Sequence, residues 1–265
     1  MKMKNDFEVS LRTRVRKRKS FNIKTSTYIS QVSFLEQNIV YSNKIHYYKK
    51  NIHYQTYGLD WSISFGNLPP NTVKVRSGSE LISLEGPTLI FHKPFSIIEF
   101  HIEEGPLKWG YIGSSTKCPI EIDDCTMITN QELGFSFNQQ HVVDMLKILR
   151  TGNKIIQEKK VSALAEKLKI FLDKNYCEKA GLSEYAKKNR VSRVVMTRSF
   201  TQTYGISPIE YKIKLRIFRA LAYMREGMSI TEALYLVGFS NPSLFIRNFK
   251  NYLNASPHQY KSKVF

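Results

Sequence analysis

The sequence has few residues of the kinds that build disulfide-bonded, metal-bound or membrane-spanning proteins. Its three cysteines, Cys118, Cys125 and Cys177, are an odd number at irregular spacings, which supplies neither a disulfide framework nor a tetrahedral zinc site. No apolar run approaches the ~18 residues of a membrane span, and the basic N-terminus is not followed by the apolar segment of a signal peptide. These absences favour a cytoplasmic protein without membrane contact.

Acidic residues are also scarce, most clearly in the second half of the chain. The 40 Lys and Arg residues outnumber the 22 Asp and Glu residues, for a formal net charge of +18. Residues 151–265 hold 21 basic and 8 acidic residues, whereas residues 1–150 hold 19 and 14. A basic C-terminal half is typical of nucleic-acid binding, although it also fits an anionic membrane surface or simple solubility.

Six of the basic residues in the first half form one run, Arg12–Lys19. Such a run can be a solvated charge cluster, a contact to the minor groove or phosphates of DNA, or a site for an anionic effector. We assign residues 1–25 to a basic N-terminal arm and leave these alternatives open.

Catalytic and metal-binding patterns are missing too. The sequence shows no interpretable arrangement of a nucleophile, a base and an orienting group. We therefore expect that the protein is not an enzyme and has no catalytic residue. His46, His53, His92 and His101 raise the question of a metal site, but no glutamate stands at the expected spacing beside a histidine pair. The sequence predicts neither a metal nor a cofactor.

What is present changes character along the chain. Residues 26–150 begin with short runs rich in Tyr, Ile, Val and Phe, which predict strands near 28–34, 61–65, 88–91 and 97–102. The turn signals beside them are Gly66–Pro70, Ser77–Gly78, Glu85–Pro87 and Glu104–Pro106. This pattern predicts an antiparallel barrel or sandwich, and a helical pattern at 137–150 follows it. The polar residues 151–160 are the expected linker.

The last part, residues 161–265, shows helical periodicity throughout. An apolar stripe at 161–172 comes first, and five residues with N-cap chemistry follow it: Ser183, Ser192, Ser207, Ser229 and Asn241. They predict helices near 183–189, 192–203, 208–226, 230–237 and 242–252. The expected fold is therefore α+β and multidomain, with a β-rich N-terminal domain and an all-α C-terminal domain.

Two segments of the helical part repeat each other. Met196-Thr-Arg-Ser-Phe200 with Ser207-Pro-Ile-Glu-Tyr211 returns 49 residues later as Phe245-Ile-Arg-Asn-Phe249 with Ser256-Pro-His-Gln-Tyr260. Each copy predicts a short helix, a turn and a second helix, an arrangement that can place the second helix in the major groove of DNA. Met196, Phe200, Phe245 and Phe249 should face inward. The outward candidates for DNA contact are Arg193, Val194, Thr197, Arg198 and Thr201 in the first copy, and Ser243, Ile246, Arg247 and Lys250 in the second.

Residues 160–262 resemble the DNA-binding domain of the AraC/XylS transcription regulators. The resemblance is carried by Leu182-Ser-Glu-Tyr-Ala186, Met196-x-Arg-x-Phe200, Gly205-Ile-Ser-Pro-x-x-Tyr211, Arg216 with Ala220, Gly238-Phe239, Phe245-x-Arg-x-Phe-Lys250 and Ser256-Pro-x-x-Tyr260. It implies two helix-turn-helix subdomains joined by helix 208–226. It also implies a cupin-like effector or dimerisation domain at 26–150, in which segment 137–150 would pair two subunits.

Two departures from the family pattern stand in the second copy. Ala233-Leu234 replaces the usual Ile-Ala, which puts a bulkier side chain at a helix contact, and Asn254 replaces a glycine. Asparagine tolerates the left-handed conformation after a helix, so the second change is mild. By the same alignment the second copy presents Pro242, Ser243, Ile246 and Arg247 to the bases, which is poor in side chains for bidentate contacts.

The sequence thus predicts a nucleoid-associated, sequence-specific transcription regulator, more in keeping with an activator. Its expected partners are double-stranded DNA, RNA polymerase, a small-molecule effector or regulatory protein, and a second copy of the chain. Arg198 and Arg247 can alternatively contact phosphates, as Lys250 most simply does. Two other functions stay open: an architectural or weakly specific DNA-binding protein, and an enzyme fused to a DNA-binding module with Cys118 and Cys125 as reactive thiols.

Overall fold

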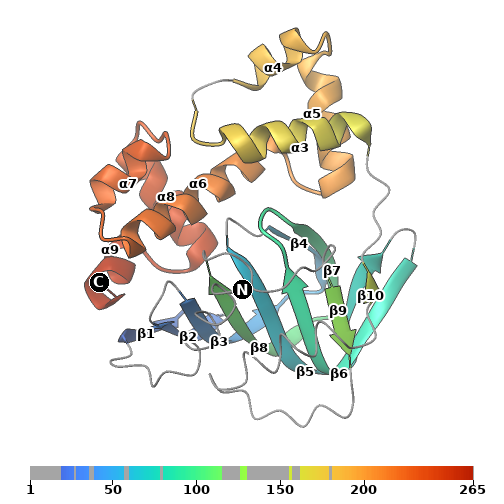
Figure 1. The fold of residues 1–265 in the computed structure, drawn as a ribbon. Helices are drawn as coiled ribbons and strands as arrows, with labels where there is room; N and C mark the ends of the chain where they lie inside the picture. Colours follow the sequence, from blue (N-terminus) through green and yellow to red (C-terminus); the bar gives the residue numbers. More distant parts are fainter. Residues whose placement is uncertain are drawn as a thin grey trace, which may run out of the picture.

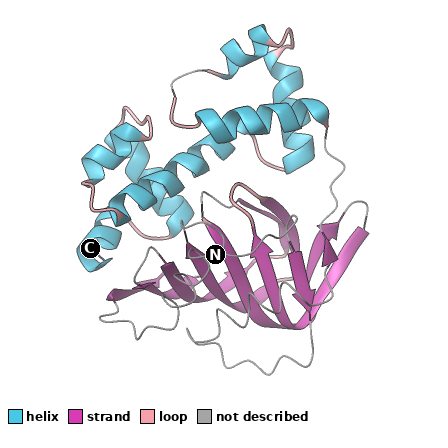
Figure 2. Ribbon diagram, viewed as in Figure 1, coloured by secondary structure: helices cyan, strands magenta, loops and turns pink. Residues whose placement is uncertain are grey.

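The computed structural model describes residues 19–26, 28–35, 39–56, 60–77, 80–114, 126–129, 155–156, 162–178 and 181–264. A β-rich half-barrel is followed by a helical domain, and the helices lie on one side of the sheet (Figures 1 and 2). The expected helix 137–150, Cys118, Cys125 and residues 12–18 of the basic run lie outside the described residues.

One antiparallel sheet forms the N-terminal domain. Its strands are β1 (Lys19–Lys24), β2 (Tyr28–Leu35), β3 (Ile39–Tyr48), β4 (Asn51–Thr56), β5 (Trp61–Ser77), β6 (Glu80–His92), β7 (Ile97–Ile102), β8 (Gly105–Ser114), β9 (Thr126–Thr129) and β10 (Ile155–Ile156). The path runs β1-β2-β3-β8-β5-β6-β9-β10, and β7 pairs with β4 and β5. Strands were correctly predicted at 28–34, 61–65, 88–91 and 97–102, but several are longer than expected.

Two of the expected turns are irregularities inside long strands. β5 and β6 pair from Ser62 opposite His92 to Ser77 opposite Glu80, with a register shift between Leu68 and Val73. Residues 66–70 and 85–87 therefore do not end strands, as the sequence had indicated. Proline has no N–H for the ladder and tolerates a bulge, so Pro and Gly mark an interruption of pairing here rather than a turn.

Two strands fall in ranges that the sequence assigned elsewhere. β1 lies within the range of the basic arm, and β10 lies within the linker range 151–160. In β1 the apolar Phe21 and Ile23 alternate with polar residues, and Ile23 is buried. The adjoining charge run masked this alternation, which by itself is typical of a half-buried strand.

The C-terminal domain consists of seven described helices. They are α3 (Ala163–Asn175), α4 (Leu182–Lys188), α5 (Arg193–Tyr204), α6 (Pro208–Arg225), α7 (Ile230–Leu236), α8 (Pro242–Leu253) and α9 (Pro257–Val264). We call α4 with α5 the first pair and α7 with α8 the second pair; α6 joins them (Figure 1). Five of these helices match those predicted at 183–252, to within a few residues at each end.

Capping chemistry explains why most boundaries were predictable. Ser192, Ser207 and Asn241 each accept a hydrogen bond from the backbone N–H three residues on, and Ser229 forms a full capping box with Glu232. The prediction for Ser183 was wrong: α4 begins one residue earlier, its N-cap is a glycine, and Ser183 lies inside the first turn. Helix α9 was not predicted, although Ser256 and Gln259 exchange the same reciprocal cap hydrogen bonds.

The sheet contacts both halves of the helical domain. Ile97 belongs to the apolar core formed by α3 to α6, and Ile23 and Val32 belong to the core formed by α6 to α9. An ion pair joins the end of α6 to the start of β5, with Arg225 Nη2 3.0 Å from Asp60 Oδ2. The side chain of Arg225 is only 4% exposed. The two domains thus share buried contacts, polar and apolar.

Candidate nucleic-acid interface

Helix α5 is anchored by its inner face and exposed on its outer face. Met196 and Phe200 are fully buried, and the ring of Phe200 lies 5.7 Å from the ring of Tyr211 on α6. Among the predicted contact residues, Arg193, Val194, Arg198 and Thr201 are exposed and Thr197 is partly buried. The inward and outward assignments made from helical spacing are therefore confirmed for this helix, with Thr197 at the boundary.

Helix α8 has the same arrangement. Phe245 and Phe249 are fully buried and lie with ring centroids 5.6 Å apart. The predicted outward residues Ser243, Ile246, Arg247 and Lys250 are all exposed. The structure thus brings the nine predicted contact residues onto two separate exposed helix faces, five on α5 and four on α8.

Leu244 on α8 shares these faces, in keeping with the apolar surroundings expected for Arg247. Three other side chains there were not singled out from the sequence: Val195 and Gln202 on α5, and Asn251 on α8. Val195 is 53% exposed and Leu244 is 38% exposed. The same periodicity could have found them, because residues 195, 198 and 202 recur at helical spacing. Apolar side chains on this face can contact thymine methyl groups.

The helix N-termini differ in charge in a way that suits an anionic partner. Among the described helices, a glutamate occupies the first turn of α3, α4, α6 and α7, but no acidic residue occupies that of α5, α8 or the C-terminal α9. The N-terminal end of a helix carries a partial positive charge that favours phosphate. No acidic side chain therefore offsets this partial charge on α5 and α8, the two helices with the exposed faces.

Arg216 holds the two pairs in a fixed relation. This side chain of α6 donates to three backbone carbonyl oxygens: Nε to that of Tyr176 at 2.6 Å, Nη2 to that of Glu178 at 3.0 Å, and Nη1 to that of Gly238 at 3.0 Å. The first two carbonyls follow α3, which packs on α5, and the third lies in the turn of the second pair. One side chain thus connects the supports of both exposed helices.

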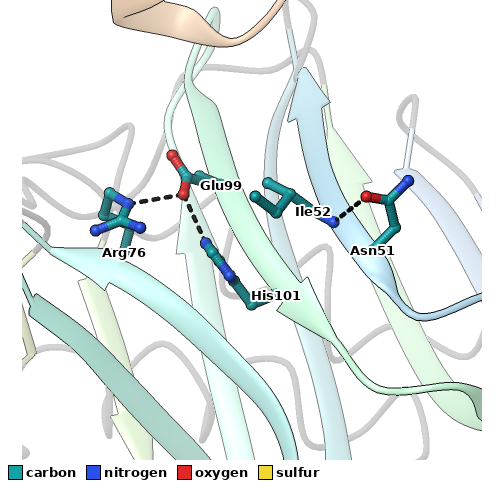
Figure 3. Close-up of polar contacts among 5 residues, drawn as sticks. All are labelled: Asn51, Ile52, Arg76, Glu99 and His101. Carbon is teal, nitrogen blue, oxygen red and sulfur yellow. Dashed lines mark hydrogen bonds and ion pairs between the residues drawn. The ribbon is translucent and has the colours of Figure 1, made fainter.

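The histidines of the β domain have different polar partners, among them the carbonyl of Lys49 for His53 and the hydroxyl of Ser64 for His92. Nε2 of His101 lies 2.6 Å from Glu99 Oε1, which also accepts from Arg76 Nε at 2.7 Å (Figure 3). Burial raises the pKa of Glu99, but the hydrogen bonds from Arg76 and His101 outweigh it and hold this pKa below its usual value. Among the residues that the structure describes, no three His, Cys, Asp or Glu side chains gather as a metal site.

Cys177 is the one cysteine in the described ranges. Its thiol is free and half-buried after α3, and burial raises its pKa.

None of the helices in the described part of the chain is long and apolar enough to cross a membrane.

Comparison with known proteins places the helical domain. Residues 185–263 match the family model described as a helix-turn-helix domain, and this segment contains both exposed helix faces and, except for the start of the motif at Leu182, the motifs of the AraC/XylS pattern. The C-terminal domain belongs to the AraC/XylS family. Its relatives include the HTH-type transcriptional regulators YdeC of Bacillus subtilis, 34% identical over 88 residues, and YdiP of Escherichia coli, 32% identical over 103 residues. The activator VirF of Yersinia enterocolitica is 30% identical over 95 residues.

The chain spans about a third of the length of these relatives. The matches cover 33%, 38% and 36% of this chain and 30%, 34% and 35% of the relatives. Among solved structures, ToxT of Vibrio cholerae is 14% identical, with 91% of this chain and 99% of that chain covered and a TM-score of 0.46. The C-terminal domain of AraT from Geobacillus stearothermophilus is 26% identical, covers 39% and 87%, and has a TM-score of 0.37. With TM-scores below 0.5, both are distant likenesses.

The two departures from the family pattern are accommodated within the AraC-type domain. Leu234 is buried in the core of α6 to α9 beside Ala233. Asn254 follows α8 with φ of 56°, which confirms the left-handed conformation expected of it. Neither substitution interrupts a helix.

Proposed function

We propose that the protein is a bacterial, sequence-specific transcription regulator that binds double-stranded DNA through residues 161–265. The observation that carries this proposal is the pairing of exposed, acid-free faces on α5 and α8 with fully buried anchors behind them. A helix anchored in this way can enter the major groove without rearranging its own core. The basic charge of the domain supplies attraction to the phosphates.

In this proposal the two pairs are helix-turn-helix subdomains that occupy successive major grooves. The contacts come from Arg193, Val194, Thr197, Arg198 and Thr201 on α5, and from Ser243, Ile246, Arg247 and Lys250 on α8. Arg198 and Arg247 can donate to guanine or to phosphate, and Lys250 to phosphate. The clamp made by Arg216 supports a fixed spacing between the two contacts, because it ties the turn of the second pair to the support of the first.

The β domain is proposed to be a cupin-like regulatory domain over residues 26–150, preceded by the basic arm 1–25 and followed by a linker at 151–160. Its buried contacts with both helical cores support a role in control. An effector, a regulatory protein or pairing with a second copy would act through it. Two relatives are transcription activators by name, VirF and the lactose operon transcription activator of Staphylococcus xylosus, which supports activation and hence contact with RNA polymerase.

Selection of bound duplexes from random DNA by the full-length protein tests the proposal. We expect one preferred site with two conserved blocks about one helical turn apart. In the same assay Lys250→Ala should weaken binding to all sequences alike and lower the salt dependence by about one counterion, since a phosphate contact carries no base preference. Enrichment of no site would contradict sequence-specific regulation.

That outcome would favour the architectural alternative. One observation speaks for it: Leu244 and Ile246 are exposed on α8 and cannot hydrogen-bond to bases. An architectural protein would bind every duplex with similar affinity and a steep salt dependence.

A further inference from the structure

The turn between β6 and β7 has an aromatic residue where glycine is expected. The N–H of Ser96 donates to the carbonyl of Lys93 at 3.2 Å and closes a four-residue turn, in which Pro94 is second and Phe95 third. Phe95 has a left-handed backbone, with φ of 64°. Turns with proline second and a positive φ third usually have glycine or asparagine in the third position. A bulky side chain there strains the backbone.

Strain of this kind persists only where surrounding contacts hold the backbone in place. Phe95 contacts the helical domain with both its ring and its backbone. The ring packs against the apolar core formed by α3 to α6 and lies 6.5 Å from the ring of Tyr176. The carbonyl oxygen is 3.3 Å from the hydroxyl of Tyr211, which donates to it. Ile97, two residues further on, is buried in the same core.

Tyr211 connects this turn to helix α5. The side chain of Tyr211 is fully buried, and its ring lies 5.7 Å from that of Phe200, an anchor of α5. Its hydroxyl also donates to Asp173 Oδ1 on α3, at 2.5 Å. The other carboxylate oxygen pairs with Lys169 Nζ at 2.8 Å, which fixes the acceptor in place. One tyrosine therefore contacts the β6–β7 turn, α3 and the anchor of α5.

The second pair is supported differently. Tyr260, the equivalent tyrosine of the repeat, lies with its ring 5.5 Å from that of Phe249, an anchor of α8. The residues of the sheet that join this core are Ile23 in β1 and Val32 in β2. Both lie in regular strands and have no positive φ. Between the two pairs, the strained contact with the sheet is thus a feature of the first.

We infer that the β6–β7 turn is a positioning element for α5, with Phe95 and Tyr211 as the positioning residues. The turn supports Tyr211, and Tyr211 supports Phe200, so the half-barrel fixes the orientation of the exposed face of α5. The same contact leaves α8 unaffected. An effect on the part of the DNA site bound by α5 rests on the proposed function, whereas the positioning itself does not.

Hydrogen exchange of the full-length protein, followed by mass spectrometry, tests the positioning without DNA. Phe95→Gly relieves the positive φ and removes the ring, whereas Tyr211→Phe keeps the ring and removes the hydroxyl. Each should lower the protection of the α5 amides by at least about threefold, because a buried contact is lost, and leave the α8 amides unchanged. In Phe95→Gly the amides of β6 and β7 should keep their protection, since glycine suits the turn.

Each variant has a matched control. Asn71→Gly also replaces a residue with positive φ, 58°, but Asn71 is exposed and its N–H donates to Glu85 within the half-barrel. Tyr260→Phe removes the hydroxyl at the equivalent position of the second pair. Both controls should leave the α5 amides unchanged. The inference is overturned if Tyr211→Phe, the milder change, leaves α5 as protected as before, or if α5 and α8 lose protection equally, which would indicate general destabilisation.

DNA binding provides a readout that a loss of stability alone would not change. Arg198→Ala identifies the conserved block of the selected site that α5 binds. In competition with duplexes in which one block is scrambled, Phe95→Gly should lose preference for that block and keep its preference for the other. Equal loss at both blocks would contradict positioning of α5 alone. If no site is selected at all, the proposed function fails, while the exchange experiment still decides the positioning.

Discussion

The two helix pairs contain the same turn, built around different residues. In each pair the residue after the turn centre donates its N–H to the carbonyl five residues back, at 3.0 Å. The turn centre itself has a left-handed backbone, with φ of 54° at Arg190 in the first pair and 83° at Gly238 in the second. This is the hydrogen-bond pattern with which many helices end. Backbone geometry alone therefore accepts either residue.

Packing explains why only the second turn has a glycine. A Cβ on Gly238 would lie 2.3 Å from the carbonyl oxygen of Cys177 and 3.0 Å from Nη2 of Arg216. Arg190, by contrast, is exposed. The turn of the second pair is pressed against the support of the first pair, whereas the turn of the first pair faces solvent. The second pair is thus positioned through its turn and the first is not.

The largest effect should follow from Gly238→Ala. The substitution combines left-handed strain with a steric clash against backbone, so we expect a loss of about 2–5 kcal/mol in the free energy of unfolding. Urea denaturation followed by circular dichroism measures it. Gly227→Ala is the matched control, because Gly227 also has positive φ, 99°, but no atom lies within 4 Å of its added Cβ. Equal losses in both variants would show that the contact with Cys177 is unimportant.

The second prediction concerns the two exposed faces. Arg198 on α5 has the exposed Val194 and Val195 one turn before it and the polar Thr201 and Gln202 one turn after it. Arg247 on α8 stands beside the exposed Ile246 and Leu244. We expect Arg198→Ala to relax base preference at a particular position by about 1–3 kcal/mol, and Arg247→Ala to weaken all sequences more evenly. Competition binding against every single-base variant of the selected site measures both. If both variants lose the same affinity for every sequence, the two pairs do not differ in base preference and the asymmetry is wrong.

The sequence revealed features of this comparison that are local. Ser192 and Asn241 mark the starts of α5 and α8 because a cap hydrogen bond spans only three residues. The same locality explains the inward assignment of Phe200 and Phe249 from helical spacing. On α5 and α8, eight of the nine predicted contact residues were placed correctly on exposed surface and Thr197 is partly buried. Their contact with DNA stays a prediction.

Features that depend on distant residues could not be derived from the sequence. The need for glycine at position 238 arises from Cys177, 61 positions earlier in the chain. Pairing of β5 with β6 decides that Pro69 and Pro70 lie in a bulge and not in a turn. The contact between Phe95 and Tyr211 likewise joins residues 116 positions apart in the chain.

A smaller, opposite effect is expected in the first pair. Arg190→Gly should stabilise the protein by up to about 1 kcal/mol, because glycine adopts positive φ without strain. Part of this gain is offset, since glycine makes the unfolded chain more flexible. The same urea denaturation measures it. A loss of stability would mean that the Arg190 side chain makes a stabilising contact, and that the first turn is not simply a free surface turn.

The smallest effect separates the first helices of the two pairs by pH. Glu232 completes the capping box of α7, and its hydrogen bonds with Ser229 lower its pKa. The N-cap of α4 is Gly181, which has no side chain to cap the helix. A carboxyl whose folded pKa is depressed contributes stability above its unfolded pKa, near 4.3, and loses that contribution as pH falls through the folded value. Hydrogen-exchange protection of the α7 amides, corrected for intrinsic rates, should therefore fall below about pH 4 more than that of the α4 amides. Glu232→Gln keeps a cap acceptor that does not titrate, so α7 should then follow α4; an unchanged difference would assign the pH dependence to another group.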